Sequence, residues 1–378
     1  MALPLNRVLA ALERIAPLEL AESWDNVGLL VDPREPGVEL DVERVLLAID
    51  ATPEVVEEVV AQRAQCLVAY HPPLFKEKRR YRRVTDPVLF AAAASGCAVY
   101  SPHTALDSAP GGINDWLAGC LGATAAEITP LSAICRKARG ELKLVVFVPE
   151  ANADALRDAL SEAGAGVIGA YSKCSFGLRG EGTFLGDEST TPAVGEKHRF
   201  ERAPELRLEM VCPERALPAV ARALEKTHPY EEPAWDVYRL ADKPVLGAGV
   251  GRRVELQEPR SLGELVGLLK KNLGLSSLRL AESSVHAAGV PIRSVAVAAG
   301  SGSGVFAGSP PSDLYLTGEM RHHDVLELLA RGSSVVLCEH SSSERGYLER
   351  LRARLLAETD GAVSVSVSEK DREPLRVV

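Results

Sequence analysis

A histidine and a glutamate lie four residues apart near the C-terminal end of the chain, directly after a strand-like apolar run. The run at 334–338 stops at Glu339, His340 follows, and Glu344 falls in the first turn of the next helical pattern. A strand end followed by a helix start is where open α/β sheets bind their ligands. Imidazole and carboxylate groups suit Zn, Mn or Fe, but one of each cannot hold an ion alone. The rest of the chain must supply further ligands.

Three other predicted strands also end in histidine or acidic residues. These residues are His71 after the strand at 66–70, His103 and Asp107 after the strand at 98–100, and Glu319, His322 and His323 after the strand at 314–316. A lone histidine at a strand end is more often structural, but the ends of parallel strands converge at one edge of a sheet. Carboxylates such as Asp107 and Glu344 can bridge two ions. The mixed set therefore predicts a two-metal hydrolytic site.

Strand and helix patterns alternate in the two outer parts of the chain, which predicts largely parallel sheets there. The middle part differs, because its order of strand, helix, strands, helix and strand is typical of a small α+β unit. We therefore expect an α/β core formed by residues 1–135 and 245–378, interrupted by an inserted α+β domain at 136–244.

Composition excludes several classes of protein. The chain has 378 residues, 46% of them hydrophobic, which indicates a soluble protein of more than one compact unit. A net charge of −9 argues against bulk nucleic-acid binding and against anionic membranes. No apolar stretch has transmembrane length, and charges at Arg7, Glu13 and Arg14 interrupt any signal-peptide core. Seven scattered cysteines without a C-x-x-C pair fit a reducing compartment, so we expect a cytoplasmic protein.

Several loop segments allow two interpretations. A basic run follows His71 and is either a solvated loop or a lip that attracts an anionic or phosphorylated substrate; it comprises Lys76, Lys78, Arg79, Arg80, Arg82 and Arg83. The glycine-rich turn at 300–304 could present backbone N–H groups to an anion or could shape the rim of a pocket. Trp24 is interpreted as a core or interface anchor, and Asp25 and Asn26 as turn formers.

Five segments in the outer parts of the chain resemble motifs of the NIF3 (DUF34) family, whose members are often named GTP cyclohydrolase 1 type 2 homolog. They occur in the family's order, at 23–29 (SWDNVGL), 70–75 (YHPPLF), 101–107 (SPHTALD), 318–324 (GEMRHHD) and 339–346 (EHSSSERG). Three segments of the middle part resemble the insert of the longer bacterial members, which is similar to the PII/CutA ferredoxin-type fold. These are 169–176 (GAYSKCSF), 180–184 (GEGTF) and 228–233 (HPYEEP).

The resemblance implies a two-lobed NIF3-like core, a homo-hexamer built as a trimer of dimers, and two divalent metal ions per subunit. Zn is the expected metal, with Mn or Fe as alternatives. The ligands carried over position by position are His71, Asp107, His340 and Glu344. Many bacterial relatives have His-His-Pro where this chain has Tyr70 before His71, so His103, Tyr70 or water would complete the site.

The resemblance also implies a metal-dependent hydrolase that acts on a nucleotide-like or phosphorylated compound. The named candidate is a GTP cyclohydrolase reaction, which cleaves cyclic amidine C–N bonds. In such a reaction His322, His323 or His103 would transfer the proton. The alternative is a non-enzymatic protein that binds or delivers metal, or a regulatory protein whose insert mediates assembly or sensing.

Overall fold

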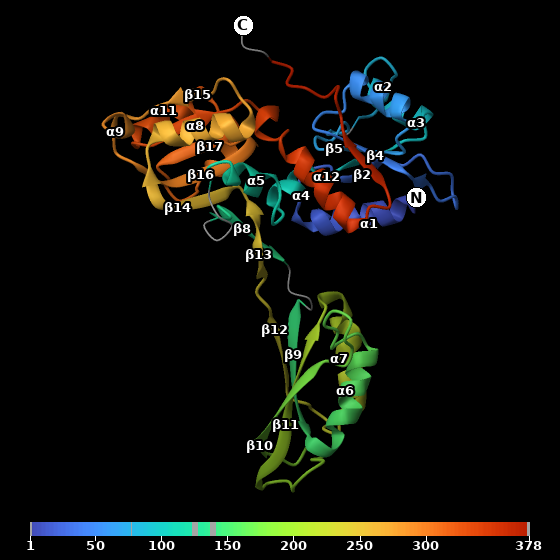
Figure 1. Cartoon of the computed structure of the whole chain (residues 1–378). Helices are drawn as coiled ribbons and strands as arrows, with labels where there is room; N and C mark the ends of the chain where they lie inside the picture. Colours follow the sequence, from blue (N-terminus) through green and yellow to red (C-terminus); the bar gives the residue numbers. More distant parts are fainter. Residues whose placement is uncertain (1, 77, 123–127, 137–140, 376–378) are drawn as a thin grey trace. The chain divides into compact units, whose positions relative to one another are not determined.

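The computed structural model describes residues 2–76, 78–122, 128–136 and 141–375. The chain divides into two compact units (Figure 1). Unit 1 combines Met1–Ile134 with Val245–Val378, and unit 2 is Cys135–Pro244. The start of the insert predicted at residue 136 borders residues 137–140, which lie outside the described residues.

The first sheet of unit 1 has five strands in the order β19-β4-β5-β6-β2. The strands β19, β4, β5 and β6 are parallel, and β4, β5 and β6 are largely apolar and buried, whereas β2 pairs antiparallel to β6 at one edge. The bounds are β2 (Gly28–Val31), β4 (Arg44–Ala48), β5 (Cys66–Ala69), β6 (Ala98–Ser101) and β19 (Ser364–Val367).

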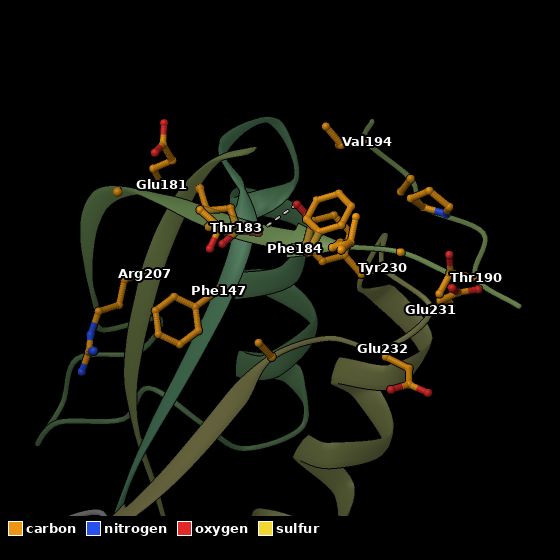
Figure 2. A pocket seen from close by; sticks show the side chains of 18 of the residues that line it. Phe147, Glu181, Thr183, Phe184, Thr190, Val194, Arg207, Tyr230, Glu231 and Glu232 are labelled. Carbon is orange, nitrogen blue, oxygen red and sulfur yellow. Dashed lines mark hydrogen bonds between the residues drawn. The ribbon is translucent and has the colours of Figure 1, made fainter. Parts of the chain in front are cut away.

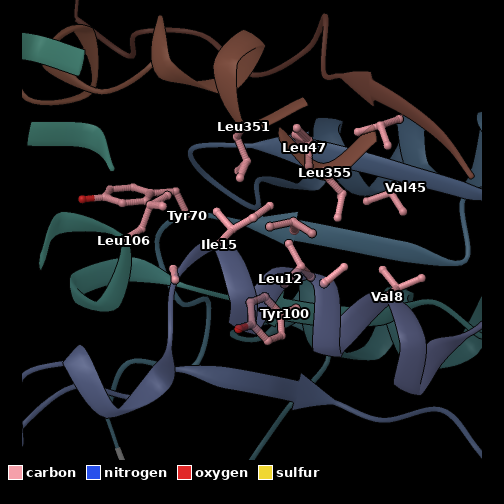
Figure 3. Close-up of a cluster of buried hydrophobic side chains, with 14 of the residues drawn as sticks. Val8, Leu12, Ile15, Val45, Leu47, Tyr70, Tyr100, Leu106, Leu351 and Leu355 are labelled. Carbon is pink, nitrogen blue, oxygen red and sulfur yellow. The ribbon is translucent and has the colours of Figure 1, made fainter. Parts of the chain in front are cut away.

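Alternate residues of the first sheet belong to two different cores. On one face, Val45 and Leu47 pack with side chains of α1 (Leu5–Ile15) and α12 (Tyr347–Glu358), as Figure 3 shows. On the other face, Leu46 packs with side chains of α2 (Pro53–Gln62) and α3 (Pro87–Ala94). Since both faces are buried, the ends of these strands are the parts of the sheet that can carry a site.

The second sheet of unit 1 has six strands in the order β15-β18-β17-β16-β14-β7. Its central strands β16, β17 and β18 are parallel, because helical crossovers connect them, but the three outer pairs are antiparallel. The expectation of largely parallel sheets is thus correct for the first sheet and wrong for the edges of the second. The strand bounds are β7 (Ile128–Thr129), β14 (Arg252–Arg260), β15 (Arg279–Ala281), β16 (Ile292–Ser301), β17 (Leu314–Glu319) and β18 (Ser334–Leu337).

Helices also cover both faces of the second sheet. One core includes side chains of α5 (Ile113–Gly119) and α8 (Leu262–Leu273), and the other includes side chains of α10 (Ser303–Phe306) and α11 (His322–Ala330). Two strand pairs lie outside these two sheets and the sheet of unit 2. In the first, β1 (Leu3–Pro4) pairs with β3 (Asp41–Val42), and in the second, β8 (Ser132–Arg136) pairs with β13 (Lys243–Val250). Two short helices are α4 (His103–Ser108) and α9 (Ser284–Ala287). Among the residues that the structure describes, no helix combines the length and apolarity needed to cross a bilayer.

Unit 2 has a ferredoxin-like βαββαβ order. Its antiparallel sheet runs β10-β11-β9-β12, and apolar side chains of α6 and α7 pack on one face of it. The bounds are β9 (Leu142–Pro149), α6 (Ala153–Glu162), β10 (Ser175–Leu185), β11 (Phe200–Cys212), α7 (Leu217–Thr227) and β12 (Trp235–Arg239). The turn-rich stretch at 186–196, which the sequence predicts to be a long hairpin loop, lies in the connection between β10 and β11.

Candidate metal centre

The strand ends of the two sheets in unit 1 share one cavity of about 530 Å³. His71 follows β5, His103 begins α4 after β6, and His340 follows β18. These three histidines line the cavity together with Tyr70, Asp107, Glu344 and Gly300. The structure therefore brings the four predicted metal ligands, and His103, into one place.

His71, His340 and Glu344 form the tightest group, with one ligand atom of each within 4.8 Å of the others. Nε2 of His71 lies 3.5 Å from Oε2 of Glu344, and Nε2 of His340 lies 3.5 Å from Oε1. The Glu344 side chain is 2% exposed. Among the described residues, no hydrogen-bond donor reaches its Oε2.

These separations suit a shared cation better than direct hydrogen bonds. Two ligands that each lie about 2.1 Å from a tetrahedral Zn ion are about 3.4 Å apart, whereas a strong charged hydrogen bond is about 2.8 Å. A buried carboxylate oxygen without a donor also requires a positive partner. The residues present therefore fit a divalent metal ion.

Each of the three cavity histidines is oriented by a carboxylate at Nδ1. The pairs are His71 with Asp50 at 2.9 Å, His103 with Asp25 at 2.8 Å, and His340 with Glu319 at 2.9 Å. When such a ring is neutral and donates its proton from Nδ1, the Nε2 lone pair is available to a metal ion. Carboxylate–histidine pairs of this kind fix the ring and tautomer of metal ligands.

The charges of the site favour a cation. Burial by itself would lower the pKa of His71, but the hydrogen bond with Asp50 and the negative charges of Glu344 and Asp50 raise it to about 10. Burial would also raise the pKa of Asp50, yet the hydrogen bond with His71 and the nearby positive charges keep it below its usual value. The Asp50 carboxylate thus remains charged, and it stabilises positive charge on His71.

Tyr70 is a hydrogen-bond donor to Asp107. The hydroxyl of Tyr70 donates to Oδ1 of Asp107. Burial and the negative charges of Asp107 and Glu344 raise the pKa of Tyr70 well above its ordinary value, so the phenol keeps its proton. Burial raises the pKa of Asp107 to about 6, against the lowering effect of that hydrogen bond. Tyr70 therefore positions a predicted ligand.

Trp24 and Asp25 differ from their sequence-based interpretation. Trp24 is 60% exposed and lines the cavity, with its ring 5.9 Å from Phe75 and 6.3 Å from His103, so it is not a core anchor. The Asp25 carboxylate is fully buried and accepts hydrogen bonds from His103 and from the backbone N–H of Thr104. Asp25 is therefore more than a turn former.

The segment that carries His340 and Glu344 also differs from expectation. A 3₁₀ turn (Ser341–Ser343) follows His340, and α12 begins only at Tyr347, so Glu344 precedes the helix. Ser343 does not cap that helix, because its hydroxyl donates to the carbonyl of His340 and accepts from the N–H of Gly300. His340 and Glu344 nevertheless face each other, with Nε2 of His340 3.5 Å from Oε1 of Glu344.

Gly300 is required by its neighbours at the site. Its φ is +62°, and a Cβ atom there would lie 2.7 Å from Oε1 of Glu344 and 3.0 Å from Nε2 of His340. Its N–H is already bonded to Ser343. The turn at 300–304 therefore shapes the rim of the cavity, and its first N–H is not available to an anion.

The C-terminal segment connects both sides of the site. The carboxylate of Asp371 accepts from the N–H of Ile49 at 2.6 Å and pairs with Arg345. Glu373 accepts from the Ser341 hydroxyl at 2.6 Å. These contacts hold two segments in place: the residues that follow β4, which include Asp50, and the turn after His340.

Two sets of predicted residues lie outside the cavity lining. His322 and His323 are exposed at the start of α11, with their rings 5.5 Å apart. The side chains of the basic run after His71 are exposed as well, and Lys78 pairs with the buried carboxylate of Asp86. Within one chain, His103 is thus the predicted proton-transfer histidine that reaches the cavity.

Comparisons with known proteins agree over nearly the full chain. A family model described as Duf34/NIF3 (NGG1p interacting factor 3) matches residues 3–374. NIF3-like protein 1 of Bos taurus is 36% identical over 378 residues, which cover 99% of this chain and 92% of that protein. A GTP cyclohydrolase 1 type 2 homolog of Halalkalibacterium halodurans is 32% identical, with 98% of each chain covered.

Solved structures show the same fold. A Bacillus cereus protein related to NIF3 matches with a TM-score of 0.66 and 30% identity, covering 100% of this chain and 99% of that one. A Staphylococcus aureus protein matches with a TM-score of 0.76 and 24% identity, again covering 100% and 99%.

Proposed function

Because the chain belongs to the DUF34/NIF3 family, as its motifs predict, we propose that unit 1 contains a dinuclear metal centre and that this centre has hydrolase activity. Its substrate would be a nucleotide-like or phosphorylated compound. One observation carries the metal part of this proposal: two imidazole Nε2 atoms lie 3.5 Å from a buried carboxylate, one oxygen of which has no hydrogen-bond donor among the described residues.

Four residues would hold the two ions. His71, His340 and Glu344 converge already, and Asp107 approaches from α4 on the same cavity. Glu344 is the proposed bridging ligand, since its two oxygens face the two different histidines. The imidazole and carboxylate donors, without a thiolate, suit Zn, with Mn or Fe as alternatives.

The residues around the ions have distinct proposed roles. Bound divalent ions supply Lewis acidity and lower the pKa of a coordinated water. Asp50 and Glu319 hold the two ligand histidines in orientation. His103, held at Nδ1 by Asp25, offers Nε2 to accept or return a proton. Trp24 gives a planar base an aromatic surface beside the cavity.

A hydrolase reaction on a cyclic amidine C–N bond, as in GTP cyclohydrolases, is the specific activity that we propose to test. The support is that several relatives carry the name GTP cyclohydrolase 1 type 2 homolog. Purified protein loaded with Zn, Mn or Fe would be incubated with GTP and other nucleotides, and the products would be followed chromatographically. We expect metal-dependent turnover that is at least about a hundredfold lower in Glu344→Ala.

A metal-handling function is the second candidate, and one observation favours it. The basic run lies outside the cavity lining, and the Gly300 N–H is already occupied, so neither provides a phosphate contact inside the cavity. If no nucleotide is turned over faster than by Glu344→Ala, the hydrolase proposal fails. Transfer of metal to an apo-acceptor faster than release into a chelator would then support delivery.

The proposal extends to assembly and location. We expect a homo-hexamer, a trimer of dimers, in the cytoplasm, with unit 2 acting as a PII/CutA-like domain in assembly or regulation. The ferredoxin-like strand order of unit 2 supports the last point. Light scattering would give a mass of about six chains, and a monomer mass at micromolar concentration would contradict the hexamer.

A further inference from the structure

The face of the unit 2 sheet away from α6 and α7 forms one wall of a second cavity, of about 560 Å³ (Figure 2). The loop after β10 and the segment before β12 complete its walls. Its apolar surface comes from Phe147, Leu178, Phe184 and Val194. The cavity is large enough for a small organic molecule. Two motifs of the insert, 180–184 and 228–233, meet there.

A chain of hydrogen bonds fixes one wall of this cavity. The N–H of Tyr230 donates to Nδ1 of His228 at 3.1 Å, so the ring proton is on Nε2, which donates to the Phe147 carbonyl at 2.9 Å. The hydroxyl of Tyr230 donates to Oε1 of Glu205 at 2.9 Å. His228 thus orients Tyr230, and Tyr230 orients the Glu205 carboxylate.

Gly182 leaves space for the other oxygen of Glu205. A Cβ atom at residue 182, which neighbours β11 in the sheet, would lie only 2.3 Å from Oε2 of Glu205. Among the described residues, no Lys, Arg or His forms an ion pair with Glu205. A carboxylate that is half-buried, held at one oxygen and without an ion-pair partner favours a cationic ligand over a neutral or anionic one.

The other charged residues of the lining leave the cavity negative. Arg179 and Arg207 are each paired with a carboxylate that does not line the cavity, Glu150 and Glu209 respectively. The further acidic residues of the lining are Glu181, which pairs with Arg202 outside the lining, and Glu231 and Glu232. An anionic ligand would therefore be repelled. The Arg207 guanidinium lies 5.7 Å from the centroid of the Phe147 ring, so the chain's own cation already lies over this ring and the ligand's cationic group is assigned to Glu205 instead.

We propose that the cavity of unit 2 binds an organic cation, an amine or amidinium group attached to an apolar or aromatic body. The cationic group would lie against Glu205, with the body between Phe147, Phe184 and Tyr230. A neutral ligand of the same shape would leave the Glu205 charge without a partner. This site is separate from the metal residues, because every residue that lines it belongs to unit 2.

Binding of a fluorescent primary amine tests this proposal. Dansylcadaverine would be titrated into the full chain, with its N-acetylated, uncharged form as the matched probe. We expect saturable binding of the amine, at least about tenfold weaker binding of the acetylated form, and about tenfold weaker binding of the amine to Glu205→Gln. Glu225→Gln, on the exposed surface of α7, is the control and should bind as the wild type does.

The glutamine variant should keep its fold, because its amide oxygen can still accept from Tyr230. Unchanged thermal unfolding and metal content would establish this. Gly182→Ala provides a second variant, since its methyl group would displace the Glu205 carboxylate. Equal binding of the charged and acetylated probes, unchanged binding to both variants, or no saturable binding to the wild type would each overturn the proposal.

Discussion

Replacement of Glu344 by glutamine is expected to abolish metal retention without unfolding the protein. Glutamine has the shape of glutamate, but it removes the negative charge that faces both His71 and His340. We expect metal affinity to fall by at least about a hundredfold, a larger loss than removal of a residue that only orients a ligand. The measurement is the metal content of the purified variant after dialysis.

Thermal unfolding provides an independent readout of the same variant. Metal at a hundred to a thousand times the wild-type dissociation constant should stabilise the wild type by about 3–4 kcal/mol, and a hundredfold weaker Glu344→Gln by no more than about 1.4 kcal/mol. Glu349→Gln is the matched control, because Glu349 is exposed on α12 and pairs only with Arg352 among the described residues. A Glu344→Gln protein that retains wild-type metal content would refute the assignment of Glu344.

Replacement of Asp107 by asparagine should instead remove one of two ions. Asp107 lines the cavity but stands outside the tight group of His71, His340 and Glu344. The asparagine oxygen can still accept the hydrogen bond from Tyr70, so the fold should be kept. We expect the metal content to fall from about two equivalents per chain to about one.

The Asp107 variant separates a dinuclear centre from a single ion site. Asp41→Asn is its control, because Asp41 is exposed on β3 and does not belong to the strand ends that carry the cavity histidines. Retention of both ions would show that Asp107 is not a ligand. Loss of both ions would show that the two positions do not bind metal independently.

The convergence of the candidate ligands could be predicted from sequence because each lies at or shortly after a strand end, whereas the ligand set itself came from the family resemblance. An apolar run that stops at a histidine predicts a strand and places the histidine at the end of that strand. His71, His103 and His340 were therefore expected to converge at one edge of a sheet, and all three line one cavity. Asp107 and Glu344 follow within one turn of those histidines. Local spacing was sufficient for these residues.

Two of the three carboxylates that orient the histidines, Asp25 and Asp50, were not found in the same way, whereas Glu319 was expected at a strand end. Asp25 reaches His103 across 78 residues of sequence, and a polar cluster at 23–26 looks like any turn. Asp50 does carry a signal, since it directly follows the buried run at 45–49, but a carboxylate after a strand has many other uses. The exposure of Trp24 likewise depends on tertiary packing.

Strand direction and the cavity of unit 2 could not be predicted from the sequence either. Hydrophobic periodicity does not distinguish a parallel edge strand from an antiparallel one, so the pairing of β14 and β15 could not be assigned. The role of Tyr230 depends on Glu205, a strand residue 25 positions away that looks like ordinary surface charge. Only the structure places the two motifs of the insert around one space.

Metal analysis of the native protein tests the central claim most directly. The protein would be purified without added metal or chelator, and its divalent ions would be quantified by inductively coupled plasma mass spectrometry together with the protein concentration. The proposed centre, with Glu344 between two histidines and Asp107 beside them, predicts about two equivalents per chain, mainly Zn. Less than about one equivalent, with no uptake on addition of Zn, Mn or Fe, would contradict it.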